Sequence, residues 1–198
     1  MHKSVLMPIV AILVASCILL GAYNGLLVFR QARDEAELKA KMQTILPGSS
    51  EFTQEEYTGE DSNIRVVYKG ENGYVIQTVT YGYAGNITML IGVSNEGKVT
   101  GLQIRQMQET YGLGAQALTD WEFLGQFLNT AGNVAIATSG ADAFSVATQK
   151  PAEGEEVYVD GISGATVTSK AIARSVNSAV AFVTGADATT QATKWGGQ

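Results

Sequence analysis

The sequence predicts an α+β domain attached to one N-terminal transmembrane helix. Three observations carry this prediction: a 25-residue segment without charge, a series of four strand-like segments, and a final amphipathic helix. Strands followed by helices are typical of an α+β domain, here an antiparallel sheet with helices. We expect four parts: an anchor at residues 1–29, a helical stalk at 30–48, a domain at 49–185 and a flexible tail at 186–198.

Val5–Phe29 is the predicted membrane anchor. As a helix it is about 37 Å long, and the hydrocarbon core of a bilayer is roughly 30 Å thick. A cleaved signal peptide is one alternative, but the apolar segment is too long and no A-x-A site closes it. A lipoprotein signal is another, because Val14–Cys17 resembles a lipobox, yet mostly apolar residues continue after it. Counting Lys and Arg on each side of the span favours a cytoplasmic C-terminal domain.

A polar helix is predicted to follow the span at Arg33–Ile45. It has acid–base pairs at Glu35–Lys39 and Glu37–Lys41, with the acid first, which is the favourable order. Pro47–Gly48 should end it. We interpret this segment as a stalk.

Four strands are predicted from Ile64 onwards, because the segments are rich in β-branched and aromatic residues. They are Ile64–Lys69, Tyr74–Tyr81, Asn86–Val93 and Lys98–Gln106. The links between them are too short to cross over a sheet, so we expect an antiparallel meander. Two further strands, Phe144–Thr148 and Glu156–Val159, are expected around a turn at Pro151–Gly154.

Two helices are predicted in the domain. The first runs from Thr119 to about Leu128, and its Thr119 and Glu122 have the spacing of a capping box. The second runs from about Val167 to Thr184, and Gly185 should end it. Its buried face is expected to consist of Ile172, Val176, Val180 and Val183.

The composition excludes several kinds of function. The 169 residues after Phe29 carry 12 Lys and Arg (13 in the chain less Lys3) against 19 Asp and Glu, a net charge of −7. An acidic domain without basic runs is a poor match for nucleic acid. The only histidine is His2 and the only cysteine is Cys17. Ser–His–Asp and Cys–His catalysis, thiolate clusters and Cys/His zinc sites are therefore excluded after the anchor. We predict no catalytic residue and no metal site, so the chemistry must come from carboxylates, hydroxyls, the backbone or a cofactor.

Gly112–Ala117 has the G-x-G-x-x-A spacing of a dinucleotide-binding turn. Its context does not fit, because the preceding strands are predicted to be antiparallel and no acidic residue follows about 20 residues later. We interpret it as a loop between a strand and a helix.

Asp160–Ser169 lies between a predicted strand and the last helix. Asp, Ser and Thr are common helix caps, so Thr166, Thr168 or Ser169 is expected to cap this helix. The free N–H groups of such a turn also bind phosphate well. Gly161, Gly164 and Ala165 should leave Thr166 accessible.

Ser163–Ser169, with the sequence SGATVTS, resembles the flavinylation motif of the FMN-binding domain family. The best-known members are the G subunit of the Rnf electron-transport complex and the C subunit of the sodium-pumping NADH:quinone reductase. The resemblance implies that FMN is joined through its phosphate to Thr166. It also implies that a separate flavin transferase installs the FMN and recognises Asp160, Ser163, Gly164, Ala165 and Thr166.

Glu109–Gly114, with the sequence ETYGLG, resembles the family's E-T-P-G-L-G loop beside the flavin. Tyr111 stands where the family usually has proline. The resemblance implies ring packing by Leu113 and Gly114 and polar contacts from Glu109, Thr110 and Thr168. Ser163, Gly164, Ala165 and Val167 are also expected beside the cofactor.

The resemblance implies a one-electron carrier that is not catalytic alone, in an Rnf-type membrane complex that couples ferredoxin oxidation and NAD reduction to ion transport. It places the domain outside the inner membrane, against the charge count, and we follow it because a flavin relay across the membrane requires that side. The alternatives are the C subunit of a sodium-translocating NADH:quinone reductase or a related flavinylated carrier, noncovalent FMN binding, and a membrane-anchored binding or assembly module without a cofactor. The implied partners are the other subunits, the flavin transferase and the membrane, and no nucleic acid.

Overall fold

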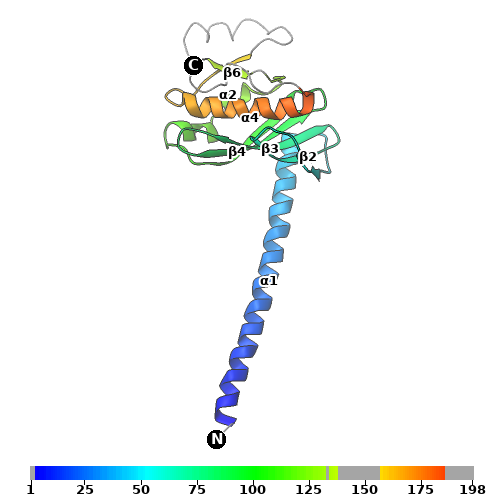
Figure 1. The fold of residues 1–198 in the computed structure, drawn as a ribbon, viewed down its shortest axis with the longest axis vertical. Coiled ribbons are helices and arrows are strands. Elements are labelled where there is room, and N and C mark those ends of the chain that lie inside the picture. Colours follow the sequence, from blue (N-terminus) through cyan, green and yellow to red (C-terminus); the bar gives the residue numbers. More distant parts are fainter. Residues whose placement is uncertain (1–2, 133, 138–156, 186–198) are drawn as a thin grey trace. The chain divides into compact units, whose positions relative to one another are not determined.

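The computed structural model describes residues 3–132, 134–137 and 157–185. The first helix, α1, runs without interruption from Lys3 to Ile45 and covers Val5–Phe29, the predicted anchor helix, and Arg33–Ile45, the predicted polar helix (Figure 1). The chain divides into two compact units, of which the first ends at Lys41 and the second begins at Met42.

The first unit consists of helix alone in its described part. Between Ile12 and Ile45, α1 contains a stretch that is long and apolar enough to cross a membrane. Its large apolar side chains between Ile12 and Phe29 are exposed, as they should be in a helix that meets lipid. Nearer its end, Lys41 and Glu37 form the predicted ion pair.

The second unit contains a five-stranded antiparallel sheet with the order β1-β2-β3-β4-β5. The predicted meander is confirmed, and every predicted strand end lies within one residue of the observed end. The four strands are β2 (Ile64–Lys69), β3 (Gly73–Tyr81), β4 (Asn86–Ser94) and β5 (Val99–Met107). A short strand that was not predicted, β1 (Thr53–Glu55), pairs with β2 at the sheet edge.

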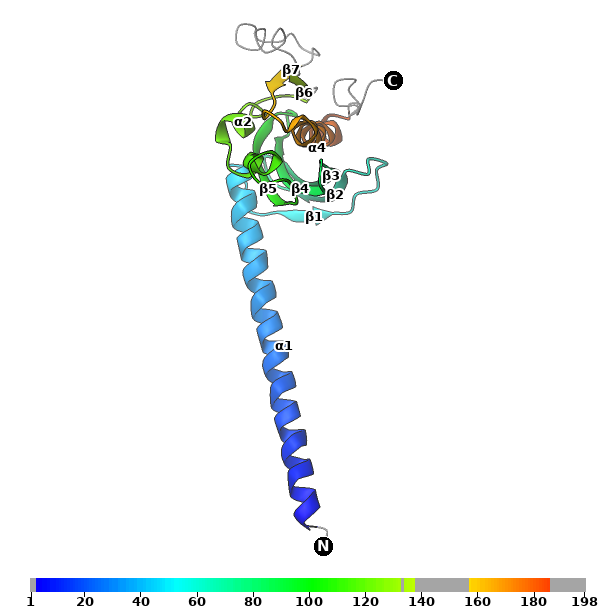
Figure 2. The same cartoon turned by 90° about the vertical axis from the view of Figure 1, so that its left-hand side faces the viewer.

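The last helix, α4, spans Thr166–Thr184 and lies between two sheets. It contacts β3 and β4 on one side and β6 on the other, and Figure 2 shows it end-on in this position. The second sheet is a parallel pair of β6 (Val134–Ala137) and β7 (Val157–Asp160). The predicted inward face of α4 is confirmed, because Ile172, Val176 and Val180 are buried and Val183 packs against the same core.

Side-chain hydrogen bonds fix α4 to both sheets. On the β3 side, Thr80 Oγ1 donates to Ala171 O at 3.0 Å and lies 2.9 Å from Ser175 Oγ. On the β6 side, Asn177 accepts from Val134 N–H at 2.9 Å and donates to Val134 O at 3.0 Å. Gly185, with a φ of +69°, ends the helix as predicted.

The helix before β6 differs from the prediction. A 3-10 helix, η1 (Gly114–Leu118), precedes a short α2 (Trp121–Gly125). Asp120 is the N-cap of α2, and its carboxylate accepts from Phe123 N–H at 2.9 Å. The predicted capping box of Thr119 and Glu122 was therefore wrong, because Asp120, at the next position, caps the helix instead by accepting from Phe123 N–H.

The remaining predicted segments have mixed outcomes. Glu156–Val159 corresponds to β7, which pairs with β6, a strand that the sequence analysis missed. Phe144–Thr148, the turn at Pro151–Gly154 and the tail at 186–198 lie outside the described residues.

Two glycines let the chain that enters the second unit pack directly on the sheet. Gly92 of β4 and Gly101 of β5 are register partners. A Cβ at Gly92 would lie 2.6 Å from Ile45 O, and a Cβ at Gly101 would lie 2.7 Å from the same oxygen. Thr100 Oγ1 donates to this oxygen at 2.8 Å. Since a methyl group at either position meets backbone, the close approach requires glycine.

We expect Gly101→Ala to destabilise the second unit by about 1–3 kcal/mol, because the added methyl group overpacks against the Ile45 backbone. Gly125→Ala is the matched control, since a Cβ at this helical position meets nothing within 4 Å and alanine favours helix by about 1 kcal/mol. Thermal unfolding of the detergent-solubilised chain, followed by near-ultraviolet circular dichroism, measures both. Equal midpoints for the two variants would contradict the packing argument.

Candidate functional site

The start of α4 has no side-chain cap. The N-cap is Ala165, and the hydrogen bond that opens the helix runs from Ser169 N–H to Ala165 O. The prediction that Thr166, Thr168 or Ser169 caps the helix was wrong, because the cap position falls one residue before Thr166. The Ser169 hydroxyl instead accepts from Ile162 N–H and donates to Ala165 O, both at 3.0 Å. The amides of Thr166 and its two successors therefore have no intrahelical acceptor.

Thr166 presents a free hydroxyl at this helix start. Its side chain is exposed and has no hydrogen bond with any residue that the structure describes. Gly164, two residues earlier, has a φ of +75°, which favours glycine. The rest of the motif divides by exposure: Ser163 and Gly164 are exposed, Val167 is half-buried, and Ala165 and Thr168 are buried.

The two motif segments meet in space although about 50 residues separate them in the sequence. Thr168 Oγ1 donates to Glu109 Oε2 at 2.9 Å, and Glu109 Oε1 accepts from Ala84 N–H at 3.2 Å. Glu109 thus joins the start of α4 to the β3–β4 turn. Gly164 lies beside Leu113, whose Cδ2 would be 3.1 Å from an added Cβ.

Gly114 is buried between the two ends of the Glu109–Thr168 hydrogen bond. A Cβ there would lie 2.6 Å from Thr168 Oγ1 and 2.9 Å from Glu109 Oε2. The absence of a side chain at Gly114 is therefore what allows the loop to approach α4 this closely.

Thr110–Leu113 has the features of a type II turn. Leu113 N–H donates to Thr110 O, and Gly112 has a φ of +78° at the third position, where that turn needs glycine. Tyr111 occupies the second position, which also favours proline. The turn therefore keeps its conformation although Tyr111 stands in place of the usual proline. Tyr111 is 96% exposed and Leu113 is 43% exposed, so both side chains are free to meet a ligand.

Asp160 ends β7, and its backbone rather than its carboxylate holds it in place. Its N–H donates to Gln126 Oε1 at 2.9 Å, and its carbonyl accepts from Gln126 Nε2 at 3.5 Å. The exposed carboxylate makes no hydrogen bond within the part of the chain that the structure describes. Asp160 is thus accessible to a visiting protein.

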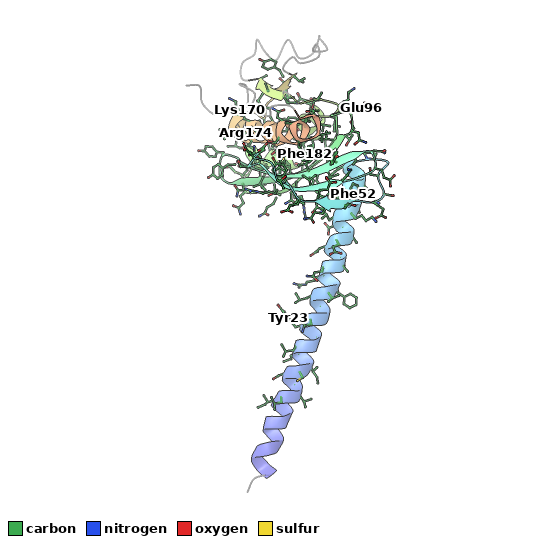
Figure 3. All side chains as sticks on the ribbon, turned by 45° about the vertical axis from the view of Figure 1, so that its right-hand side comes forward. Tyr23, Phe52, Glu96, Lys170, Arg174 and Phe182 are labelled. Carbon is green, nitrogen blue, oxygen red and sulfur yellow. The ribbon has the colours of Figure 1, made fainter. Side chains whose placement is uncertain are left out.

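Two cations that sequence reasoning missed follow Thr166 on α4, and Figure 3 labels both of them. Lys170 and Arg174 are both half-buried. Arg174 Nη2 donates to Tyr81 O at 2.9 Å, and its buried Nε has no partner among the described residues. Burial lowers the pKa of Arg174, because desolvation disfavours the charged form. The signal in the sequence was their spacing of four and eight residues from Thr166.

This arrangement suits an anionic group attached through an oxygen. The exposed hydroxyl has unpaired helix amides beside it, and the positive end of the helix dipole stabilises a phosphate ester. Glycine at 164 keeps the approach open. Among the described residues there is no cluster of three metal-binding side chains. The residues therefore fit a tethered phosphate. They are suited to holding a cofactor and do not form a catalytic centre of their own among the described residues.

Comparisons with known proteins agree with this site. The family of the FMN-binding domain matches residues 82–181, a range that includes both motif segments. The G subunit of an ion-translocating oxidoreductase complex from Methanosarcina acetivorans is 29% identical over 91% of this chain and 93% of that protein. The G subunit of a proton-translocating ferredoxin:NAD(+) oxidoreductase complex from Clostridium ljungdahlii is 37% identical over 56% of this chain. The match spans about half (53%) of that second protein.

A solved structure is also similar. It is the C subunit of the Na(+)-translocating NADH-quinone reductase from Parabacteroides distasonis, with a TM-score of 0.49 and 21% identity. The similarity covers 79% of this chain and 84% of that one.

We expect Thr168→Val to cost about 1–3 kcal/mol of stability, because Glu109 loses a donor to its charged oxygen. The loop at 109–114 should also loosen, since this bond ties it to α4. Hydrogen exchange read by mass spectrometry should show faster exchange in peptides covering residues 82–86 and 108–115. Thr110→Val, at an exposed threonine of the same loop, is the control and should leave exchange in both peptides unchanged. Unaltered exchange in Thr168→Val would show that the bond does not hold the loop.

Proposed function

The chain belongs to the FMN-binding domain family, and from this premise we propose that it carries FMN covalently on Thr166 as an electron-transfer subunit. The observation that carries the proposal is the exposed Thr166 hydroxyl at the start of α4, without a hydrogen bond to a described residue. It stands in the sequence Ser163-Gly164-Ala165-Thr166, beside helix amides that can bind a phosphate.

The attachment is a transfer from FAD by a separate enzyme. The Thr166 oxygen forms a new ester bond to the FMN phosphorus, the pyrophosphate bond breaks, AMP leaves, and the hydroxyl proton is released. Asp160, Ser163, Gly164, Ala165 and Thr166 form the segment that the transferase recognises. The exposure of Asp160, Ser163 and Gly164 supports this role, because a visiting enzyme can reach them.

The chain itself supplies position and electrostatics. When bound, FMN supplies the capacity to accept and give single electrons, while the protein sets its orientation and potential. Leu113, exposed beside Gly164, would pack against the ring, whereas Gly114, which was also expected at the ring, is buried against Glu109 and Thr168. Glu109, Thr168 and Gly114 hold the loop that carries Leu113 against α4. Thr110 and Val167 border the same site.

The larger assembly is a membrane-bound ion-translocating oxidoreductase of the Rnf type. Support comes from the relatives, which are named as the G subunits of such complexes, and from the apolar segment of α1. The chain would cross the membrane once and contact the other subunits of the complex. We place its domain on the extracytoplasmic side, where a covalent bond prevents loss of the cofactor.

Expression with a flavin transferase tests the attachment. We expect an ultraviolet-fluorescent band on a denaturing gel, and an intact mass larger than that of the polypeptide by one FMN ester. Thr166→Val should abolish both, because it keeps the shape and removes the hydroxyl, whereas Thr166→Ser should retain part of the signal. Flavin that is released on denaturation would favour noncovalent binding. Fluorescence that persists in Thr166→Val would move the attachment to another hydroxyl, with Thr168 as the next candidate.

A single-cysteine variant tests the side of the membrane. In Cys17→Ser/Tyr111→Cys, the new thiol replaces a side chain that is 96% exposed. A membrane-impermeant maleimide should label it in intact spheroplasts to the same extent as after lysis. Cys17→Ser alone, which has no cysteine, gives the background. Labelling that requires lysis would place the domain in the cytoplasm, as the charge count had favoured.

A further inference from the structure

We propose that Lys170 and Arg174 are the anion-binding side chains of this site, and that FMN tethered to Thr166 lies along the row they form on α4. The inference rests on the proposed function and extends it to two residues outside both motif segments.

The three residues lie on one row of the helix surface. They recur every four positions, and such rows form the ridges of an α-helix. At about 1.5 Å per residue, Lys170 lies about 6 Å and Arg174 about 12 Å from Thr166 along the axis. Side chains on a helix lean towards its N-terminus. The Lys170 side chain therefore covers the turn that begins with Thr166.

These two cations differ from the others in the second unit. Its described part has six basic residues, of which Arg65, Lys69, Lys98 and Arg105 are exposed, whereas only Lys170 and Arg174 are half-buried. Lys69 lies 3.6 Å from Glu55. Lys170 and Arg174 form no ion pair with any residue that the structure describes.

Arg174 has the stronger need for an anionic partner. Its single described hydrogen bond is to the Tyr81 carbonyl, and its Nε is buried without a partner among the described residues. Partly burying a charge without an opposite charge costs free energy, which a nearby anion would offset. Glu109 lies near the same β3–β4 turn, but its two oxygens already accept from Thr168 and Ala84.

The tethered cofactor carries a permanent negative charge at its phosphodiester, and its ring gains negative charge only on reduction. The phosphodiester keeps one negative charge, and Lys170 is placed to bind it at the Thr166 end. The isoalloxazine ring gains electrons on reduction, and Arg174 stands further along the same row. A cation beside the ring stabilises its reduced form and so raises its reduction potential.

Redox titration of the flavinylated full-length chain in detergent tests this assignment. We expect Arg174→Met to lower the equilibrium constant for reduction of the flavin about tenfold. This corresponds to a fall in midpoint potential of about 59 mV for a one-electron couple. Arg174→Lys keeps the charge and should recover most of the loss. Lys170→Met should produce a smaller fall, because its partner is the phosphodiester at the other end.

Arg105→Met and Lys98→Met are the matched controls, since each removes one positive charge at an exposed position of the same unit. Both should leave the potential unchanged. Near-ultraviolet circular dichroism verifies that each variant is folded. If Arg174→Met lowers the potential no more than Arg105→Met, the inference is wrong while the proposed function stands. If the wild-type chain carries no flavin by intact mass, both are wrong.

Discussion

The site depends on the position of α4 between the two sheets. Thr80 holds the helix from the side of the five-stranded sheet, and Asn177 holds it from the side of β6 through two hydrogen bonds to one residue. Apolar contacts bury the inner face of the helix, and these directional bonds add the requirement of one register. Because Thr166 begins that helix, its location is fixed by residues several turns away.

The Glu109–Thr168 pair makes one structure from two distant segments. One carboxylate oxygen of Glu109 accepts from the Thr168 hydroxyl at the start of α4, and the other accepts from Ala84 N–H. The β3–β4 turn is held on its other side by Arg174, which donates to the Tyr81 carbonyl. Glu109 and Arg174 thus both bind the backbone at this turn, the first through an N–H and the second through a C=O. A tethered cofactor would therefore sit on a frame whose parts move together.

Local patterns in the sequence predicted most of the fold. The strands of the meander were found because alternating and β-branched residues repeat between short links, and α4 because its apolar residues recur at helical spacing. β1 was missed because it is three residues long, too short for a periodic signal, whereas β6 was missed although β7, which has the same length of four residues, was found. The cap of α2 was misplaced because Thr119 and Asp120 are both good acceptors, and only packing selects between them.

The candidate site was less predictable from the sequence. Motif resemblance identified Thr166 and the Glu109–Gly114 loop, but their contact depends on long-range packing that spacing cannot show. The cap of α4 was misassigned for a related reason, since Thr168 and Ser169 use their hydroxyls on Glu109 and Ile162. Arg174 was missed because its burial becomes visible only when β3 packs against the helix.

The turn at Thr110–Leu113 separates what the backbone needs from what the surface displays. Gly112 has the positive φ that the turn requires. Position 111 can hold any residue with an ordinary negative φ, and the ring of Tyr111 points into solvent. A substitution at position 111 can therefore change the surface that this loop exposes without changing the backbone conformation of the turn.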